Sequence, residues 1–335
     1  MTAPPGYDVI TIGSATQDVF VSAEEAELVR IQTAEDERAL LAFEYGAKLD
    51  VKDMFITVGG GGVNTSVTFS RFALKAAVVS KIGKDAAGRT IRERLRRDGV
   101  GVDLLVVDPE QRTGYSAILL GFTGDRTVLV YRGATLALRA DELDWDTLAR
   151  TKMLFVGSLS GQTAELYPRL AEFAGERGLM LAVNPGSTQF RQGLEALSPV
   201  LQHTDVIFLN KSEAYRLTGV APESGPEDET CMCRMIHEAG AKRVVITAGP
   251  EGAEAFDGEQ QHFVPAYPVQ VAATLGAGDA FASACSAALL RGEPFVKALQ
   301  LGAANAASVV QGIGAKRGIL TWDQAQQWVA ERTEA

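Results

Sequence analysis

Residues 153–183, MLFVGSLSGQTAELYPRLAEFAGERGLMLAV, decide the fold class of this chain. Short apolar runs at 153–156 and 180–183 flank a segment at 164–177 in which apolar residues recur at helical spacing. A strand, an amphipathic helix and a second strand form the unit that connects parallel strands. The stretch therefore predicts a parallel β-sheet with a helix packed against it.

The same alternation extends over most of the chain. Further short runs rich in β-branched residues lie at 9–12, 77–82, 206–209 and 244–247. Another amphipathic segment lies at 86–97, where Ile91 and Leu95 are four residues apart. Strands that are nearly continuously apolar are expected where helices cover both faces of a sheet. We therefore predict one α/β domain over residues 1–335, with a doubly wound, mostly parallel sheet and helices on both faces.

Two segments interrupt this alternation. Residues 19–58 contain an acidic, helix-prone stretch, and after it residues 48–57 alternate as in a strand outside the main sheet. Residues 113–133 predict a hairpin with its turn at 123–125. The pattern alone leaves two interpretations open, a small β lid formed by both segments or two unrelated surface excursions.

Composition and charge limit the partners and the compartment. The chain has 335 residues, with 42 acidic against 32 basic side chains and a formal net charge of -10. This balance argues against nucleic acid or an anionic membrane as a partner. Cys231, Cys233 and Cys285 are too few for a disulfide framework. Because no secretory signal and no apolar run of about 18 residues is found, we expect a soluble cytoplasmic protein.

A glycine-rich turn, Gly276-Ala277-Gly278, opens a predicted helix of small residues near the C-terminus. The free N–H groups and the dipole of a helix N-terminus favour a phosphate or a developing anion. Asp279 follows directly. It is either a helix cap or a general base that takes a proton from an attacking hydroxyl beside the anion hole. The turn by itself leaves both roles open.

A second glycine cluster, at 59–64, precedes another predicted helix at 65–74. Glycine lets the backbone approach a ligand closely, and Asn64 offers donors and an acceptor for sugar hydroxyls. The alternative is a flexible hinge with Asn64 as a helix cap. Neither glycine cluster has the Walker A lysine or the Rossmann spacing, so those two nucleotide-binding folds are not expected.

Other candidate residues follow predicted strands. Asp18 lies a few residues after the first strand, near the edge where open α/β sheets bind ligands. Asn210 and Glu213 begin a helix after the strand at 206–209, and helix capping would explain them equally well. Residues 247–252 are either a ligand-binding turn or an ordinary turn. The order of these residues along the chain is more informative than any one of them.

In that order the motifs resemble the ribokinase-like family, also called the PfkB carbohydrate kinases, from about Asp8 to Gly318. The matching pieces are Gly13 with Asp18, 59–64, KIGKDAAG at 81–88, Asn184-Pro185, 210–213, 247–252 and 276–281. The resemblance implies a ribokinase-like fold with a β lid over 19–58 and 113–133. It also implies a phosphotransferase that uses ATP and Mg²⁺ and has an alcohol group as acceptor.

The resemblance implies a role for each matched residue. The catalytic group would consist of Asp279 as the base and the amides of Gly276, Ala277 and Gly278 as the anion hole. The hydroxyls of a sugar or nucleoside would be bound by Asp18, Gly60, Gly61 and Asn64. Mg²⁺ and the phosphates would be organised through water by Glu213 and Asn210, with Asn184 nearby. The nucleotide side would comprise Thr247, Gly249, Gly252 and Asn305.

Two departures from the family pattern narrow these expectations. Ala273 stands where many members have an aspartate that helps to bind an activating monovalent cation, so strong activation by K⁺ is not expected. Gly61 stands where ribokinases proper have lysine, so ribose itself is not implied.

Three functional hypotheses remain. The leading one is transfer of the ATP γ-phosphate to a primary hydroxyl of a sugar or nucleoside. The second is a sugar-phosphate kinase in which Arg126 or Arg132 of the lid binds the phosphate already on the substrate. The third is a catalytically impaired, kinase-like binding protein. An exposed lid edge would favour a lid-mediated homodimer.

Overall fold

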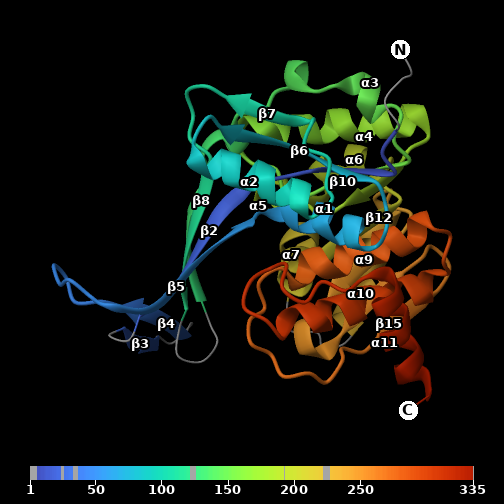
Figure 1. Cartoon of the computed structure of the whole chain (residues 1–335). Coiled ribbons are helices and arrows are strands. Elements are labelled where there is room, and N and C mark those ends of the chain that lie inside the picture. Colours follow the sequence, from blue (N-terminus) through green and yellow to red (C-terminus); the bar gives the residue numbers. More distant parts are fainter. Residues whose placement is uncertain are drawn as a thin grey trace.

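The computed structural model of the chain describes residues 6–23, 26–32, 37–120, 126–191, 193–221 and 227–334. Its body is a nine-stranded sheet covered by helices (Figure 1). The strands are β1 Val9–Ile12, β6 Ala76–Gly83, β7 Leu105–Asp108, β10 Met153–Val156, β11 Met180–Val183, β12 Val206–Asn210, β13 Val244–Thr247, β14 Ala253–Phe256 and β15 Gln261–Val264. Their order is β15-β14-β13-β12-β11-β10-β1-β6-β7, and only β14 and β15 run antiparallel to their neighbours. The prediction of a mostly parallel sheet is therefore confirmed.

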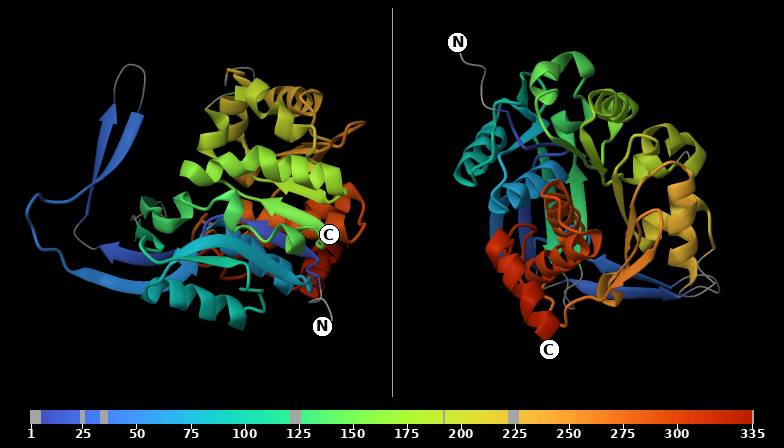
Figure 2. Two further views of the ribbon diagram at one scale, coloured as in Figure 1. Left: turned by 90° about the horizontal axis from the view of Figure 1, so that it is seen from above. Right: turned by 90° about the vertical axis from the view of Figure 1, so that its right-hand side faces the viewer.

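Helices cover both faces of this sheet (Figure 2). The α-helices are α1 Gly61–Arg71, α2 Ala86–Arg97, α3 Trp145–Leu148, α4 Leu166–Arg177, α5 Ser187–Phe190, α6 Gly193–Leu201, α7 Lys211–Thr218, α8 Glu227–Glu238, α9 Ala277–Leu290, α10 Phe295–Val310 and α11 Trp322–Glu334. Short 3-10 helices lie at Gly133–Leu136, Ala140–Glu142, Gly161–Glu165 and Gly249–Glu251.

Alternate residues of one strand enter two different cores, because successive side chains point to opposite faces. Leu154 on β10 packs in the core that includes α4, α6, α7 and α8. Phe155 packs in the opposite core, which includes α1, α9, α10 and α11. There its ring meets Phe69 of α1 edge-on, with the centroids 5.6 Å apart. Burial on both faces explains why β10 is apolar throughout.

The two segments that interrupt the alternation share a second sheet. It contains β2 Thr16–Ala23, β5 Val51–Gly59, β8 Gly114–Leu120 and β9 Arg126–Tyr131, in the order β5-β2-β8-β9. The β8–β9 hairpin and the lid interpretation are confirmed, and the alternative of unrelated excursions is wrong. The lid begins at Thr16, earlier than predicted, and the predicted turn at 123–125 lies outside the described residues.

The helix-prone stretch inside 19–58 was predicted incorrectly. Its described part forms a two-stranded antiparallel sheet, β3 Glu27–Gln32 and β4 Glu37–Ala42. Apolar residues lie opposite each other across the two strands, for example Val29 and Leu40. Such cross-strand pairs favour a sheet over a helix. The hairpin stands away from the rest of the molecule at the outer end of the lid (Figure 2).

The bounds of two other elements differ from the predicted ones. The strand predicted at 48–57 is β5 and ends at Gly59, and the helix predicted at 65–74 is α1, which begins at Gly61. Among the described residues, no helix combines the length and the apolar character that crossing a membrane would require.

Candidate active site

The first turn of α9 forms one wall of the candidate site. Gly276 precedes the helix with a φ of 82°, and a Cβ there would lie 2.5 Å from the Cβ of Ala315. Both the backbone angle and the close contact therefore require glycine. Gly278 differs, because a Cβ on it would meet no protein atom within 4 Å. Packing within the protein does not explain glycine at 278, whereas an open approach to a bound ligand would.

Asp279 lies in this first turn but does not cap the helix. Gly276 occupies the N-cap position, and no side-chain capping bond is made there. Instead, Asn64 Nδ2 donates a hydrogen bond to Asp279 Oδ2 over 2.8 Å. Removal of the carboxyl from water raises the pKa of Asp279 to about 6, and the bond from Asn64 opposes this rise. Such a carboxylate is suited to accept a proton near neutral pH.

Asn64 joins the two helix N-termini of the site. Gly60, with a φ of 93°, precedes α1, so Asn64 lies within the first turn and not at the cap position, and the alternative interpretation as a helix cap is wrong. Its Oδ1 is buried and has no hydrogen-bond partner within the described part of the chain. Because buried acceptors are normally satisfied, this oxygen is suited to a donor from a bound ligand.

A cavity of about 200 Å³ lies between the lid and these helix N-termini, and we call it the lid cavity. The residues predicted to bind hydroxyls all line it, namely Asp18, Gly60, Gly61 and Asn64. A Cβ on Gly61 would lie 3.7 Å from Asp279 Oδ1, so a longer side chain at 61 would reduce the space beside Asp279.

Asp18 is a buried carboxyl on β2, facing the lid cavity. Its Oδ1 accepts a hydrogen bond from Thr16 Oγ1 over 2.8 Å. Burial raises the pKa of Asp18, and the hydroxyls of Thr16 and Ser116 oppose that rise. A Cβ on Gly59 would lie 1.9 Å from Asp18 Oδ2, so glycine at 59 makes room for this carboxyl.

A second space of about 180 Å³, the middle cavity, lies at the carboxyl ends of β11, β12 and β13. Among its lining residues are Asn184, Asn210, Glu213, Thr247, Gly276, Gly278 and Asp279. Strand ends of a parallel sheet meet at one edge, which brings together residues far apart in sequence.

Asn210 and Glu213 form a capping box at the start of α7. Asn210 N–H donates to Glu213 Oε2 and Glu213 N–H donates to Asn210 Oδ1, each over 2.9 Å. The capping interpretation therefore holds, and both side chains also line the middle cavity. Burial raises the pKa of Glu213, and the nearby Asp279 adds to this rise.

This donor set fits Mg²⁺ held mainly through water and phosphate oxygens. The described residues contain no group of three or more His, Cys, Asp or Glu side chains that could hold a metal ion by themselves. Mg²⁺ usually keeps several waters and uses one or two carboxylates together with substrate phosphates. A divalent cation would also relieve the repulsion between Glu213 and Asp279.

The third space, the apolar cavity, has a volume of about 430 Å³. Its lining includes the predicted residues Thr247, Gly249 and Gly252, together with Val264, Tyr267 and Val310. Gly252 has a φ of 118°, and a Cβ on it would lie 2.3 Å from the carbonyl oxygen of Val264. Apolar walls with few polar groups are typical of sites for small organic ligands and cofactors.

Asn305 is not part of this cavity. It is fully buried, its Nδ2 donates to the carbonyl of Ala280 over 2.9 Å, and its Oδ1 accepts from Leu320 N–H over 2.9 Å. Both amide atoms thus hold backbone segments together. The same helix contributes Ala303, Ala306 and Ala307 to the cavity wall instead.

The three cavities follow one another across the start of α9. Asp279 lines both the lid cavity and the middle cavity, while Gly278 and Thr247 line both the middle and the apolar cavity. A ligand with a hydroxyl in the lid cavity and a ligand with phosphates in the middle cavity would meet at Asp279.

Several lining residues were missed by the sequence analysis. Thr16, Ser116 and Ala315 line the lid cavity but belong to no motif. The signal for Thr16 was its spacing, because residues two apart on a strand share a face, here with Asp18. Ser116 pairs with Asp18 across β2 and β8, a register that local sequence does not reveal.

The two lid arginines lie in different places. Arg132 lines the lid cavity. Arg126 Nη1 donates to Thr274 Oγ1 over 2.6 Å and so ties the lid to the loop before α9. In that loop Ala273 offers no carboxylate, and its N–H donates to the carbonyl of Val310 over 3.1 Å.

Comparison with known proteins gives consistent matches. The family model for pfkB family carbohydrate kinases matches residues 25–322. A ribokinase of Arabidopsis thaliana is 26% identical over 322 residues, which cover 93% of this chain and 78% of the relative. Fructokinase-1 of Zea mays is 31% identical over 241 residues, which cover 68% of this chain and 72% of the relative. The structure of Arabidopsis thaliana ribokinase complexed with ribose and ATP superposes with a TM-score of 0.80 at 22% sequence identity. The match covers 97% of this chain and 99% of that chain, so the two proteins share the fold.

Proposed function

The chain belongs to the pfkB family of carbohydrate kinases and is a phosphotransferase with an alcohol group as acceptor, and we propose that it transfers the γ-phosphate of ATP to a primary hydroxyl of a sugar in the lid cavity. The observation that carries this proposal is the position of Asp279. Its carboxyl, paired with Asn64, lies where the lid cavity meets the middle cavity.

In the proposed reaction Asp279 takes the proton from the acceptor hydroxyl while that oxygen attacks the γ-phosphorus. The bond between the γ-phosphorus and its bridging oxygen breaks, and ADP leaves. The first-turn amides of α9 stabilise the charge on the transferring group. Open space at Gly278 supports this role, because a phosphoryl group can approach the backbone there.

ATP would occupy the middle and apolar cavities. The base would lie against the apolar wall near Tyr267 and Val310, and the phosphates beside Asn184 and Thr247. Mg²⁺, held through water by Glu213 and Asn210, would neutralise charge on the phosphates. The proposed site contains no monovalent cation, because the side chain of Ala273 cannot supply a ligand.

A sugar fits the lid cavity better than a nucleoside. The cavity of about 200 Å³ is below the range of roughly 300–1,000 Å³ typical of sites for drug-sized ligands. Asp18 and the unpartnered Oδ1 of Asn64 offer buried acceptors for sugar hydroxyls. Such acceptors discriminate strongly, because an analogue without the hydroxyl leaves them unpaired.

A second candidate acceptor is a sugar that already carries a phosphate. Arg132 supports it, because this arginine lines the lid cavity and a guanidinium binds phosphate in a bidentate manner. Replacement of Arg132 by alanine would then raise KM for the phosphorylated sugar sharply and leave KM for neutral sugars unchanged.

Two measurements test the proposal. ADP release is followed with ribose, fructose, adenosine, inosine and sugar phosphates as acceptors, and turnover of at least one sugar is expected. Asp279→Asn should lower kcat by about 10³-fold, since general base catalysis contributes roughly 10²–10⁴-fold, while calorimetry shows ATP binding within about twofold of the wild type.

Asp323→Asn, in the first turn of α11, is the matched control and should keep full activity. Asp279→Asn with a substantial fraction of the wild-type rate would exclude the assigned base. Absence of turnover with every acceptor would instead favour a kinase-like binding protein.

A further inference from the structure

The loop after α10 connects the anion-hole turn to the base of the lid. Gly314 and Gly318 bound its central part, with φ of 108° and 88°, and a Cβ on Gly318 would lie 2.4 Å from the carbonyl oxygen of Ser308. These constraints fix the path of the loop. Ala315, between the two glycines, packs directly against Gly276.

Lys316 extends this connection across to the lid. Its Nζ donates a hydrogen bond to the carbonyl of Val58, near the end of β5. Val58 is buried and directly precedes the glycine cluster that leads into α1. The side chain of Lys316 thus spans from the loop beside Gly276 to the strand that pairs with β2 beside Asp18.

Charged groups face Lys316 from two elements. Asp18 faces it from β2, and Arg94 of α2 and Asp98 at the C-cap of α2 face it from the other element. Removal from water lowers the pKa of Lys316 to about 8, while both aspartates oppose this fall. The positive charge of Lys316 in turn favours the ionised form of Asp18.

We propose that Lys316 is a positioning residue for the acceptor sugar. Its ammonium holds the base of the lid against the anion-hole turn through the carbonyl of Val58, and its positive charge attracts the carboxyl of Asp18. This rests on the proposed function of the lid cavity but assigns a role to a residue outside it, because Lys316 does not line that cavity. Lys316 acts on acceptor binding and leaves ATP binding unaffected.

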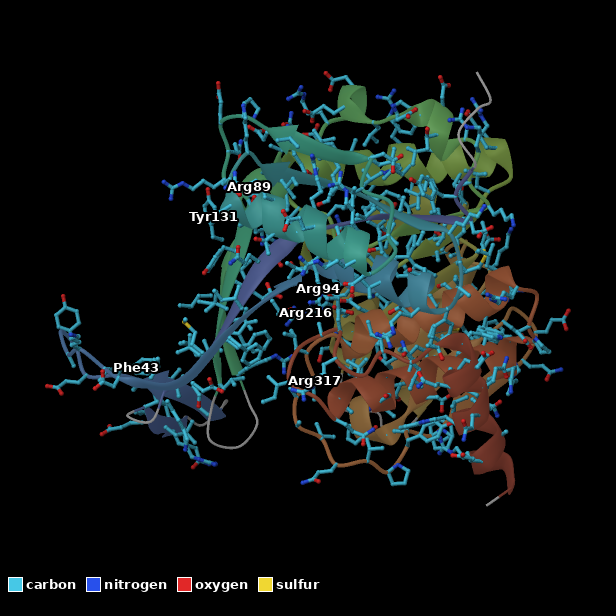
Figure 3. All side chains as sticks on the ribbon, in the orientation of Figure 1. Phe43, Arg89, Arg94, Tyr131, Arg216 and Arg317 are labelled. Carbon is cyan, nitrogen blue, oxygen red and sulfur yellow. The ribbon has the colours of Figure 1, made fainter. Side chains whose placement is uncertain are left out.

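The test compares Lys316→Met with Lys316→Arg, using an acceptor that the wild type turns over. Lys316→Met should raise KM for the acceptor by about tenfold, with KM for ATP within about twofold, and Lys316→Arg should recover most of this loss. Arg317→Met is the matched control in the same loop. Its side chain is exposed, and Figure 3 shows it on the side of the body toward the lid.

A pH profile separates a charge effect from a packing effect. In the wild type, kcat/KM for the acceptor should fall above about pH 8, because a neutral Lys316 donates a weaker hydrogen bond to the carbonyl of Val58 and no longer attracts the carboxyl of Asp18. In Lys316→Arg this fall should disappear, since a guanidinium stays charged over the whole range.

The proposal is wrong if Lys316→Met leaves acceptor KM unchanged, or if the fall above about pH 8 persists in Lys316→Arg. It is equally wrong if Arg317→Met raises KM as much as Lys316→Met does. Failure of the proposed function is a different result, because the wild type itself would then turn over no acceptor. If thermal unfolding shows that Lys316→Met is not folded, the pH profile of Lys316→Arg still tests the proposal.

Discussion

The two polar atoms of the Asn64 side-chain amide have different roles: one binds the protein and the other is available in the lid cavity. Its Nδ2 is used by Asp279, and its Oδ1 is left for a ligand. This arrangement couples the proposed acceptor site to the proposed base, because a change at Asn64 alters both. It also fixes the orientation of the Asp279 carboxyl, with Oδ2 bound and Oδ1 directed toward the position that Gly61 leaves open.

The raised pKa of Asp279 makes the rate depend on pH. A general base must be ionised, so kcat should fall about tenfold per pH unit below about pH 6. Asn64→Leu removes the hydrogen bond that opposes the rise, so its acid limb should move to higher pH. Measurement of kcat between pH 5 and about 8 checks this, and an unchanged limb in Asn64→Leu would contradict it.

The same shift affects stability. The folded-state pKa of about 6 lies above the ordinary value of 3.8 for an aspartate, so folding favours the protonated carboxyl. That stabilisation is fully present below 3.8 and is lost as pH rises through about 6. Asp279→Asn should therefore be at least as stable as the wild type at neutral pH, which allows its kinetics to be interpreted.

At the scale of elements, the first turn of α9 has two glycines for different reasons. Gly276 is required by the fold, since its φ is positive and a Cβ on it would overlap Ala315. Gly278 has helical backbone and open space around it. A matched pair of alanine substitutions in one turn can therefore separate folding from ligand approach.

Gly276→Ala should destabilise the protein by about 1–3 kcal/mol, as expected for a strained backbone with a close contact. Gly278→Ala should leave stability unchanged or raise it by about 0.4–1 kcal/mol, and it should lower kcat by about 10²-fold because the methyl group displaces the phosphoryl group. Thermal unfolding and steady-state kinetics check both. Equal kinetics for Gly278→Ala and the wild type would contradict the role given to this turn.

At the scale of the whole molecule, the lid presents apolar side chains to solvent. Met54 on β5 and Leu129 on β9 are 56% and 58% exposed, and Tyr131 on β9 is 54% exposed. Phe43 and Tyr131 are both labelled on the lid in Figure 3. Strand β3 is exposed on both faces, and a two-stranded hairpin alone is marginally stable. Exposed apolar surface of this kind marks an interaction site.

We therefore expect a homodimer formed through the lids. Light scattering at micromolar concentration should give twice the mass of one chain. Leu129→Glu should give the mass of one chain, while Val296→Glu, a matched change at an exposed position on α10, should leave the dimer intact. A wild-type protein that is monomeric at this concentration would rule out the lid interface.

Much of the fold could be predicted because its signals are local. Strands such as β1 and β10 have both faces buried, so they are almost entirely apolar, and their bounds were predicted correctly. The β3–β4 hairpin was not predicted, because its acidic residues favour a helix locally and only pairing between the two strands overrides that preference.

The candidate site, like the fold, could be predicted from the sequence only in part. The sequence by itself determined the parallel α/β class and the glycine turn before α9, because periodicity and helix termini depend on neighbouring residues. Only the tertiary structure decided that Asn64 meets Asp279, that Asn305 turns inward and that Lys316 reaches Val58. Asn64 and Asp279 are 215 residues apart, and such pairs form only when the strand order brings separate loops to one edge of the sheet.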